Sequence, residues 1–370
     1  MPFQSIKDLL SVPIYDHKCP EKQKLLLKLL RQICTHHYKN CPQYRMLCKK
    51  KDFNPQQFKT LEEIPFLPTD IFKDTLLLSI PENEVFREIQ SSATTSGRPS
   101  RMGINKENNQ LLTKSLQRIL LQRVGNKRHN TMILDDESVL GRGKVVSARA
   151  SMTKTLLFLS SKVSTCLVSD SEALRLEKNK LTKYFDQAGD GEGHLLFGFT
   201  FVLYKYVVQP LLASGTTFRL PKLKVIHAGG WKKLQDQKVS EEELIKNCCR
   251  CFGVLPENII DLYGFSEQSG LLYPTCEYGL RHTPLWSAVI CRDPLSLKPL
   301  PEKVEGLMQF ITPIQISYPG HSVLTEDIGM IIGQDKCDCG RNGTAFKVVG
   351  RSNYASEERG CGDIMSHYFN

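Results

Sequence analysis

The sequence predicts an α/β fold, and three patterns in it point to that class. Apolar runs of strand length alternate with segments whose apolar residues repeat at helical spacing. Several of these runs end in polar loops that contain glycine, as ligand-binding strands of open α/β sheets do. After Leu272, prolines and glycines separate short β-type runs such as Gly306 to Thr312. This change indicates a smaller, antiparallel, β-rich region beside the α/β layer.

The elements can be placed in order along the chain. Helical patterns cover three segments: Lys22 to His37, Asn108 to Val124 and Phe199 to Leu212. A further helix begins at the capping box of Ser240 to Glu243 and runs to about Cys251. Strand patterns cover residues 130–136, 194–198, 223–227 and 258–262, and a short one covers 348–349. Because helices and strands alternate, we expect crossover connections between the strands.

Two histidines, His36 and His37, close the first predicted helix. Such a pair can be read as metal ligands or as ordinary residues of a helix end, and we favour the second interpretation.

Composition narrows the class of protein. A chain of 370 residues with 41% hydrophobic and 24% charged residues is typical of a globular protein with one large domain or two moderate ones. Without a signal-peptide pattern or a membrane-spanning apolar run, we expect a cytoplasmic protein. The thirteen cysteines are then expected to be reduced and mostly buried thiols.

The net charge of +10 allows three kinds of partner: nucleic acid, an anionic nucleotide or an acidic protein. The lysines and arginines are spread along the chain and accompany no nucleic-acid-binding motif, so we expect no nucleic acid.

The segment from Ser91 to Arg101 is the first candidate for chemistry. Its eleven residues include six hydroxyl side chains, one glycine and two arginines, and no large apolar residue. Backbone N–H groups, hydroxyl donors and guanidinium groups are what a polyphosphate requires. The alternative is a solvated linker rich in serine and threonine.

Four later loops carry polar or glycine residues at the ends of predicted strands. Gly229 and Gly230 follow the strand that ends at His227, and they form either a ligand-contacting loop or a tight turn. In the block Tyr263 to Glu267, the tyrosine can stack on a base and the glutamate can hold Mg²⁺, or the block is a surface turn.

The third loop contains Asp327, expected at the start of a strand, where its carboxylate can accept hydrogen bonds from two ribose hydroxyls. The fourth ends in Gly350 and Arg351.

In this order, the loops resemble those of the adenylate-forming superfamily of acyl and aryl ligases, from about position 90 to 355. The resemblance implies the N-terminal domain fold of those enzymes with a smaller β-rich subdomain, and use of ATP and Mg²⁺. The ATP-binding residues that it implies are Ser92, Thr94, Thr95, Ser96, Gly97, Ser100, His227, Gly229, Gly230, Lys232, Tyr263, Gly264, Ser266, Asp327 and Arg351. Glu267 would hold the magnesium ion.

The chain departs from the superfamily pattern in two places. Ser100 stands where the phosphate loop usually has a lysine, so Arg98 or Arg101 is expected to supply the catalytic charge. The sequence also stops soon after Arg351, where typical members carry a mobile C-terminal domain. We therefore expect an adenylation domain over residues 1–350 and a short mobile tail over residues 351–370.

The short form, the sequence Ala228 to Lys232 and the segment His37 to Tyr44 are similar to the acyl-protein synthetases of the bacterial bioluminescence fatty-acid reductase complex, which are related to the phenylacetate–CoA ligase type. This resemblance implies that a long-chain fatty acid is activated as acyl-AMP. The acyl group would then pass to a cysteine near the enzyme's own C-terminus, and from there to a partner reductase.

Cys361 is the candidate for that acyl carrier, because it is flanked by glycines near the chain end. An incidental tail cysteine is the alternative. Two other functions stay open: a phenylacetate-type acyl-CoA, aryl-CoA or carrier-protein ligase, and a non-catalytic binding protein that keeps the fold.

A separate motif, Cys337-Asp338-Cys339, can be half of a zinc site, with Cys276 and His282 as further ligands. The spacing matches no standard zinc finger. The alternative is a tight turn that carries reduced thiols.

Overall fold

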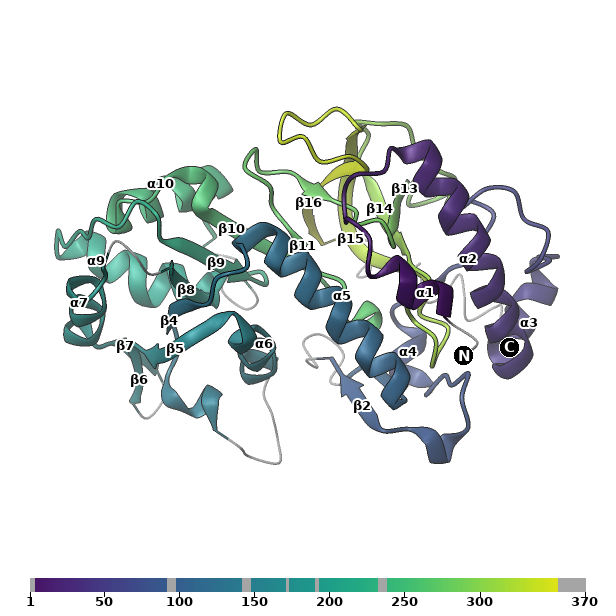
Figure 1. Cartoon of the computed structure of the whole chain (residues 1–370), viewed down its shortest axis with the longest axis horizontal. Coiled ribbons are helices and arrows are strands. Elements are labelled where there is room, and N and C mark those ends of the chain that lie inside the picture. Colours follow the sequence, from purple (N-terminus) through teal and green to yellow (C-terminus); the bar gives the residue numbers. More distant parts are fainter. Residues whose placement is uncertain are drawn as a thin grey trace. The chain divides into compact units, whose positions relative to one another are not determined.

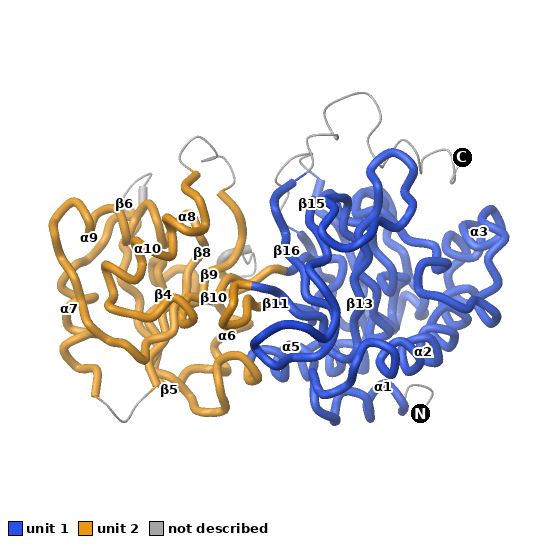
Figure 2. Tube along the Cα trace, turned by 90° about the horizontal axis from the view of Figure 1, so that it is seen from above, with its two compact units in different colours: residues 1–120, 264–273, 280–370 blue, residues 121–263, 274–279 orange. Residues whose placement is uncertain are grey.

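The computed structural model describes residues 4–91, 98–141, 148–170, 173–189, 193–231 and 238–351, and its elements are labelled in Figure 1. The chain divides into two compact units (Figure 2). Unit 1 contains residues 1–120, 264–273 and 280–370, and unit 2 contains residues 121–263 and 274–279.

A six-stranded sheet forms the centre of the α/β part. Its strands lie in the order β11 (Tyr273–Pro274), β10 (Ile259–Tyr263), β9 (Lys224–Ala228), β8 (Gly193–Phe199), β4 (His129–Ile133) and β5 (Ser160–Thr165). The pairs from β10 to β5 are all parallel. The central strand β8 is a nearly continuous, buried apolar run, because the middle of a parallel sheet is covered on both faces, whereas the edge strand β5 is polar and partly exposed. A short antiparallel pair, β6 (Leu167–Asp170) and β7 (Ala173–Leu176), accompanies the sheet.

Helices supply the apolar side chains that bury this sheet. They are α6 (Ala148–Leu156), α7 (Lys178–Asp186), α10 (Glu241–Phe252) and a continuous helical run of α8 (Thr200–Val202), the π-helical segment η4 (Leu203–Val208) and α9 (Gln209–Ala213). Val207 and Leu211 of this run join Leu196 and Val225 of the strands in one buried cluster. Burying each such side chain contributes about 1.5–3 kcal/mol to folding.

Unit 1 is organised around a second, mainly antiparallel sheet. Its order is β12 (Arg281–His282), β16 (Thr344–Arg351), β15 (Ser322–Gln334), β14 (Gly306–Ile311) and β13 (Ala288–Arg292), and β1 (Leu67–Pro68) pairs in parallel with β15. The hairpin strands β2 (Arg87–Gln90) and β3 (Arg101–Ile104) form a separate pair.

The N-terminal helices belong to the same unit. They are α1 (Gln4–Leu9), α2 (Cys19–Asn40), α3 (Pro42–Lys50), α4 (Ile71–Asp74) and the part of α5 (Lys106–Val124) up to Leu120. Leu26, Leu30 and Cys34 of α2 pack against Ala288 and Ile311 of the antiparallel sheet. The antiparallel region is therefore part of a unit that also includes the first 120 residues.

The predicted α/β fold is confirmed, and the predicted elements are found with small shifts at their ends. The capping box is present, since the Ser240 hydroxyl accepts a hydrogen bond from the Glu243 N–H at 3.1 Å. The strand predicted over 130–136 ends earlier, at Ile133, because Asp136 instead accepts a hydrogen bond from the Ser138 N–H and opens a 3₁₀ turn. His37 lies in the last turn of α2, as predicted, and its side chain is fully buried.

Every cysteine in the described ranges is a free thiol, as expected for a reduced chain. Among the helices of those ranges, none combines the length and apolar character needed to cross a bilayer.

Candidate functional site

The end of the Ser/Thr-rich loop contacts the last residue of the Tyr263 to Glu267 block. The Ser100 hydroxyl donates a hydrogen bond to Glu267 Oε1 at 2.5 Å, and both side chains are buried in unit 1. Burial raises the pKa of Glu267, and the charge of Asp327 adds to this increase, whereas the Ser100 hydrogen bond and the charge of Lys73 oppose it. Two segments that lie 167 residues apart in sequence thus meet at one carboxylate.

Backbone contacts hold Glu267 in position. It lies in the 3₁₀ turn Ser266–Gln268, and its carbonyl accepts a hydrogen bond from the Tyr318 hydroxyl at 3.0 Å. The neighbouring Gln268 amide donates to the carbonyls of Phe310 and Gly320, both at 2.9 Å. These contacts fix the backbone at Glu267 and the neighbouring Gln268 side chain, and the Ser100 hydrogen bond orients the Glu267 carboxylate.

Lys73 of α4 (Ile71–Asp74) is a cation whose charge interacts with that of Glu267. Its ammonium group donates to Asp70 Oδ1 at 2.5 Å. Burial lowers the pKa of Lys73, but the contacts with Asp70 and the charges of Glu326 and Glu267 outweigh burial and raise the pKa overall. Nothing in the local sequence distinguishes this lysine, because its link to Glu267 arises only from folding.

The two arginines predicted to supply charge have other contacts. Arg101 forms a bidentate pair with the carboxylate of Glu88, at 2.9 and 3.0 Å, across the β2–β3 ladder. Arg98 Nη1 lies 3.6 Å from Asp74 Oδ1, and both of these side chains are largely exposed. A phosphate-binding role for Arg98 and Arg101 stays a prediction.

Gly264 is required by its surroundings. A Cβ atom at this position would lie 2.7 Å from Leu272 Cδ2 and 3.0 Å from the Leu271 carbonyl oxygen. Tyr263 is the last residue of β10, and Ser266 is the first residue of the 3₁₀ turn. Gly264 therefore lies in the short connection between them, at a position where only glycine fits.

The Gly229–Gly230 loop is held by Thr200. The Thr200 hydroxyl donates to the Gly229 carbonyl at 2.6 Å and lies 2.9 Å from His227 Nδ1. Gly229 has a φ of 75°, and the position of Gly230 leaves open space where a Cβ atom would be. The buried His227 ring also lies 3.7 Å from Asp261 Oδ1. His227 therefore supports the loop from within unit 2.

Asp327 and Arg351 are brought together. They are directly opposite in the β15–β16 ladder, and Arg351 Nε lies 3.7 Å from Asp327 Oδ1. Asp327 is inside β15, not at the start of a strand as expected, because the strand already begins at Ser322.

Several predicted residues lie outside the described part of the chain. They are Ser92, Thr94, Thr95, Ser96, Gly97, Lys232 and Cys361, and their assignments stay predictions.

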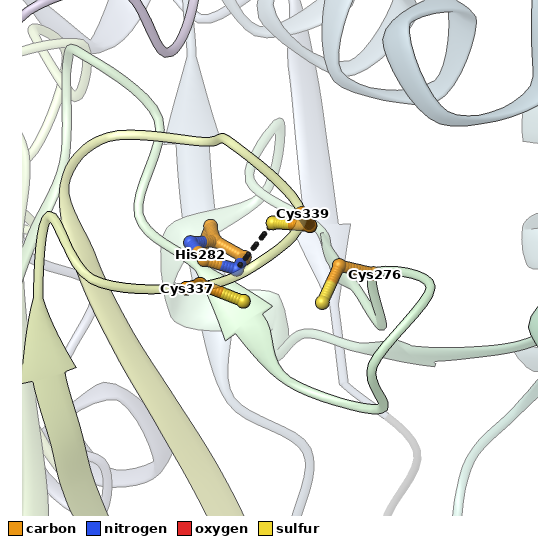
Figure 3. Close-up of side chains that lie close together, drawn as sticks. All are labelled: Cys276, His282, Cys337 and Cys339. Carbon is orange, nitrogen blue, oxygen red and sulfur yellow. Dashed lines mark hydrogen bonds between the residues drawn. The ribbon is translucent and has the colours of Figure 1, made fainter.

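The four predicted zinc ligands form a cluster (Figure 3). One ligand atom from each of Cys276, His282, Cys337 and Cys339 lies within 4.8 Å of the others. Cys339 Sγ and His282 Nε2 are 3.3 Å apart. Cys276 and His282 are buried, and the other two side chains are half-buried.

Comparison with solved structures defines the class of fold. An open conformation of 2-hydroxyisobutyryl-CoA ligase, in complex with 2-HIB-AMP and CoA, matches with a TM-score of 0.68 and 14% identity, over 91% of this chain and 76% of that chain. The same ligase in its postadenylation state matches with a TM-score of 0.65 and 15% identity, over 91% and 69% of the two chains. The fold is thus that of adenylate-forming ligases.

Sequence comparison identifies the family. The family model "Acyl-protein synthetase, LuxE" matches residues 5–370, and this chain belongs to that family. A long-chain-fatty-acid–luciferin-component ligase of Vibrio harveyi is 28% identical over 353 residues, 94% of this chain and 89% of the relative. The ligase of the same name from Aliivibrio fischeri is 22% identical over 349 residues, with the same coverage. The predicted family is confirmed.

Proposed function

We propose that this chain is an AMP-forming ligase that activates a long-chain fatty acid with ATP and passes the acyl group to a protein thiol. Membership of the acyl-protein synthetase family supports this activity, and the relatives named above carry the corresponding ligase name. The observation that carries the assignment to particular residues is the contact between Ser100 and Glu267, because it joins the predicted phosphate loop to the predicted metal-binding carboxylate.

In the first step, a carboxylate oxygen of the fatty acid attacks the α-phosphorus of ATP. The bond from that phosphorus to the bridging oxygen breaks, pyrophosphate leaves, and the mixed anhydride acyl-AMP forms. The loop that ends at Ser100 would hold the phosphates. Lys73 would offset the negative charge of Glu267. Such fixed charges stabilise the transition state electrostatically.

Magnesium fits the donor set at Glu267. Mg²⁺ prefers oxygen ligands, and with nucleotides it commonly uses one or two carboxylates and completes its shell with phosphate oxygens and water. Glu267 offers one buried carboxylate that the Ser100 hydrogen bond orients. The ion would neutralise phosphate charge, and Glu267 would hold it.

The remaining residues would bind the nucleoside part of ATP. Tyr263 and the Gly229–Gly230 loop would contact the adenine, and Asp327 would accept hydrogen bonds from the ribose. The position of Arg351 opposite Asp327 supports a common role for these two side chains.

In the second step, the thiolate of Cys361 would attack the acyl carbon, and AMP would leave as the carbon–oxygen bond to it breaks. The resulting thioester would then exchange with a cysteine of an acyl-accepting reductase. A phenylacetate-type ligase would instead use an external thiol, such as that of CoA.

Incubation of the chain with ATP, Mg²⁺ and labelled tetradecanoic acid tests both steps. We expect ATP–pyrophosphate exchange that depends on the fatty acid, and a protein label that hydroxylamine removes. Cys361→Ser should keep the exchange and lose the label, while the control Cys249→Ser keeps both.

Each other result favours a different function. A label that survives in Cys361→Ser contradicts self-acylation at this residue. Equal consumption of acyl-AMP by CoA in both proteins favours the CoA ligase. No exchange with any of a panel of carboxylic acids favours a binding protein.

A further inference from the structure

The cluster of Cys276, His282, Cys337 and Cys339 contains two turns of the same construction. In the turn Cys276 to Gly279 and in the turn Cys337 to Gly340, the glycine N–H donates to the carbonyl of the cysteine at 3.0 Å. The two glycines have φ values of 70° and 77°, a conformation that favours glycine. Each turn reverses the chain directly after a cysteine, which leaves backbone N–H groups close to the sulfur.

One of these N–H groups already contacts a sulfur atom. The Tyr278 N–H donates to Cys276 Sγ at 3.4 Å. Hydrogen bonds of this kind stabilise sulfur in its thiolate form, which is the form that binds metals.

His282 approaches the same point from β12. This strand pairs with β16, and the Tyr15 ring packs edge-on against the imidazole, with the ring centroids 6.2 Å apart. The imidazole Nε2 is directed at Cys339 Sγ, as Figure 3 shows. The ring orientation is thus determined by packing from two sides.

We propose that these four side chains bind one Zn²⁺ ion in a closed, tetrahedral Cys₃His site. Zn–S and Zn–N bonds of about 2.3 and 2.1 Å place tetrahedral ligand atoms roughly 3.5–3.8 Å apart. The observed atoms all lie within 4.8 Å of one another, so small side-chain rotations suffice. On binding, each of the three thiols releases its proton.

The site is structural and goes beyond the proposed ligase activity. Four protein ligands fill a tetrahedral shell and leave no position for water or substrate. Three thiolates and one Zn²⁺ leave a net charge of −1, and Arg341, which forms hydrogen bonds with Cys339, offsets it.

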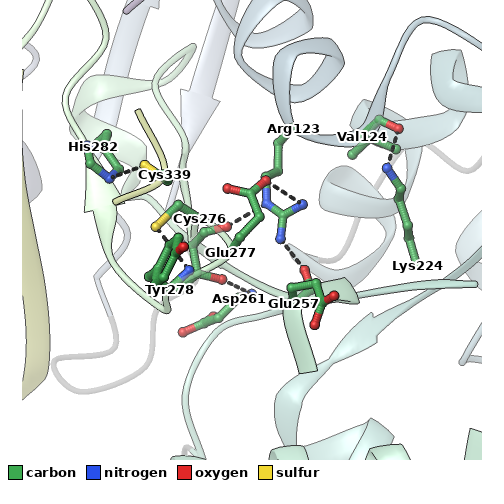
Figure 4. Close-up of polar contacts among 11 residues, drawn as sticks. Arg123, Val124, Lys224, Glu257, Asp261, Cys276, Glu277, Tyr278, His282 and Cys339 are labelled. Atoms are coloured by element: carbon green, nitrogen blue, oxygen red, sulfur yellow. Dashed lines mark hydrogen bonds and ion pairs between the residues drawn. The ribbon is translucent and has the colours of Figure 1, made fainter. Parts of the chain in front are cut away.

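The segment around Cys276 is anchored on its other side as well, within unit 2 (Figure 4). Arg123 Nε donates to the Thr275 carbonyl at 2.7 Å, and Arg123 Nη1 lies 3.4 Å from Glu277 Oε1. Thr275 and Asp261 exchange two hydrogen bonds of 3.0 Å, which tie the segment to β10. The zinc ion would complete the anchoring of a segment that follows the Tyr263 to Glu267 block, so its binding energy would contribute directly to folding.

Metal analysis of the purified full chain by inductively coupled plasma mass spectrometry tests the proposal. We expect about one zinc ion per chain, as for a structural site with four protein ligands. The double variant Cys337→Ser, Cys339→Ser should lose most of this zinc. The control Cys249→Ser, which changes a half-buried thiol in α10, should keep it, and His282→Cys should keep it too because four ligands remain.

Cobalt provides a readout that needs neither a variant nor activity. After zinc is removed from the wild-type chain, added Co²⁺ should give the ligand-field and thiolate charge-transfer bands of a tetrahedral thiolate site. A wild-type chain that carries no stoichiometric zinc and gives no such bands overturns the proposal. So does a disulfide among these cysteines, or a double Ser variant that binds as much zinc as the wild type.

Discussion

The Ser100 hydroxyl donates a 2.5 Å hydrogen bond to the carboxylate of Glu267, and both side chains are buried. In the superfamily pattern a lysine occupies the place of Ser100. A hydroxyl at this position contacts the carboxylate without adding charge, so the positive charge must come from elsewhere. The positive charge of Lys73 opposes the increase in the pKa of Glu267 that burial causes.

Ser100→Ala removes the donor and leaves the buried carboxylate of Glu267 with one hydrogen bond fewer. Because a hydrogen bond to a charged group contributes about 1.5–3 kcal/mol, we expect kcat/KM for ATP–pyrophosphate exchange to fall roughly 10- to 100-fold. The pKa of Glu267 should rise further, which moves the acid limb of the pH profile to higher pH. Ser100→Thr, which keeps the hydroxyl, should stay close to wild type. Equal losses in both variants would contradict the role of the hydroxyl.

Glu267→Gln separates activity from stability. Exchange should fall by about 100-fold or more, the range found when a group that stabilises transition-state charge is removed. The raised pKa means that the folded state holds its proton more tightly than the unfolded state, so the wild type loses stability as pH rises above the ordinary carboxyl pKa. The variant lacks this loss and should melt at a higher temperature than the wild type at pH 7. The difference should shrink toward pH 4, and a variant that is less stable at pH 7 would contradict it.

Lys73→Gln should raise KM for ATP by roughly 10-fold or more. The substitution removes the positive charge proposed to act beside the phosphates, and a hydrogen bond to a charged group contributes about 1.5–3 kcal/mol. The exposed Lys49→Gln is the matched control and should have no effect. Arg101→Gln should have a smaller effect than Lys73→Gln, because the charge of Lys73 interacts with that of Glu267, whereas Arg101 is paired with Glu88. A larger effect for Arg98→Gln or Arg101→Gln would mean that an arginine of the loop, and not Lys73, supplies the catalytic charge.

Gly264→Ala should lower the free energy of unfolding by about 1–3 kcal/mol and reduce exchange, because the added methyl group overlaps Leu272 and displaces the block that carries Glu267. Gly230→Ala meets no atom within 4 Å and should leave the melting temperature unchanged. If ATP lies against this loop, however, Gly230→Ala should raise KM for ATP. Thermal melting and exchange kinetics on both variants check the two expectations.

His321 makes stability depend on pH. Burial, with a smaller contribution from the charge of His36, lowers the pKa of His321 to about 3. Its ring stacks on His37, whose pKa burial also lowers, and His321 Nε2 lies 3.0 Å from the Tyr44 hydroxyl. Both rings are neutral when folded, whereas the unfolded histidines gain protons below about pH 6.5.

The unfolded state therefore binds more protons, and stability should fall as pH decreases from about 6.5 toward 3. Urea denaturation of wild type and His321→Gln across this range checks the expectation. The variant should show a shallower decrease. Parallel decreases would mean that other groups govern acid unfolding.

Local patterns were sufficient to predict many elements of this chain. The capping box at Ser240 was predictable because its donor and acceptor lie three residues apart. The block at Tyr263 to Glu267 and the order of the loops were sufficient to predict the superfamily, and the segments Ala228 to Lys232 and His37 to Tyr44 pointed to the family. Cys276, His282, Cys337 and Cys339 were nominated from their ligand chemistry and the Cys-x-Cys motif, although their spacing matches no standard zinc finger.

The electrostatic interaction of Lys73 with Glu267 was not predictable, because the two residues lie far apart in the sequence. The same is true of the stacking of His37, a helix-end residue, on His321. In both cases the environment of the side chain is made by other segments.

By itself, the sequence determined the helices and strands, the family and the candidate residues, because periodicity, caps and motifs act over short distances along the chain. The tertiary structure decided which side chains interact: the Ser100 hydroxyl contacts Glu267, the charge of Lys73 acts on the same carboxylate, and three sulfur atoms gather around one imidazole. Packing between segments that are far apart in the sequence sets these interactions, and it also sets the burial that shifts the pKa of Glu267 and His321.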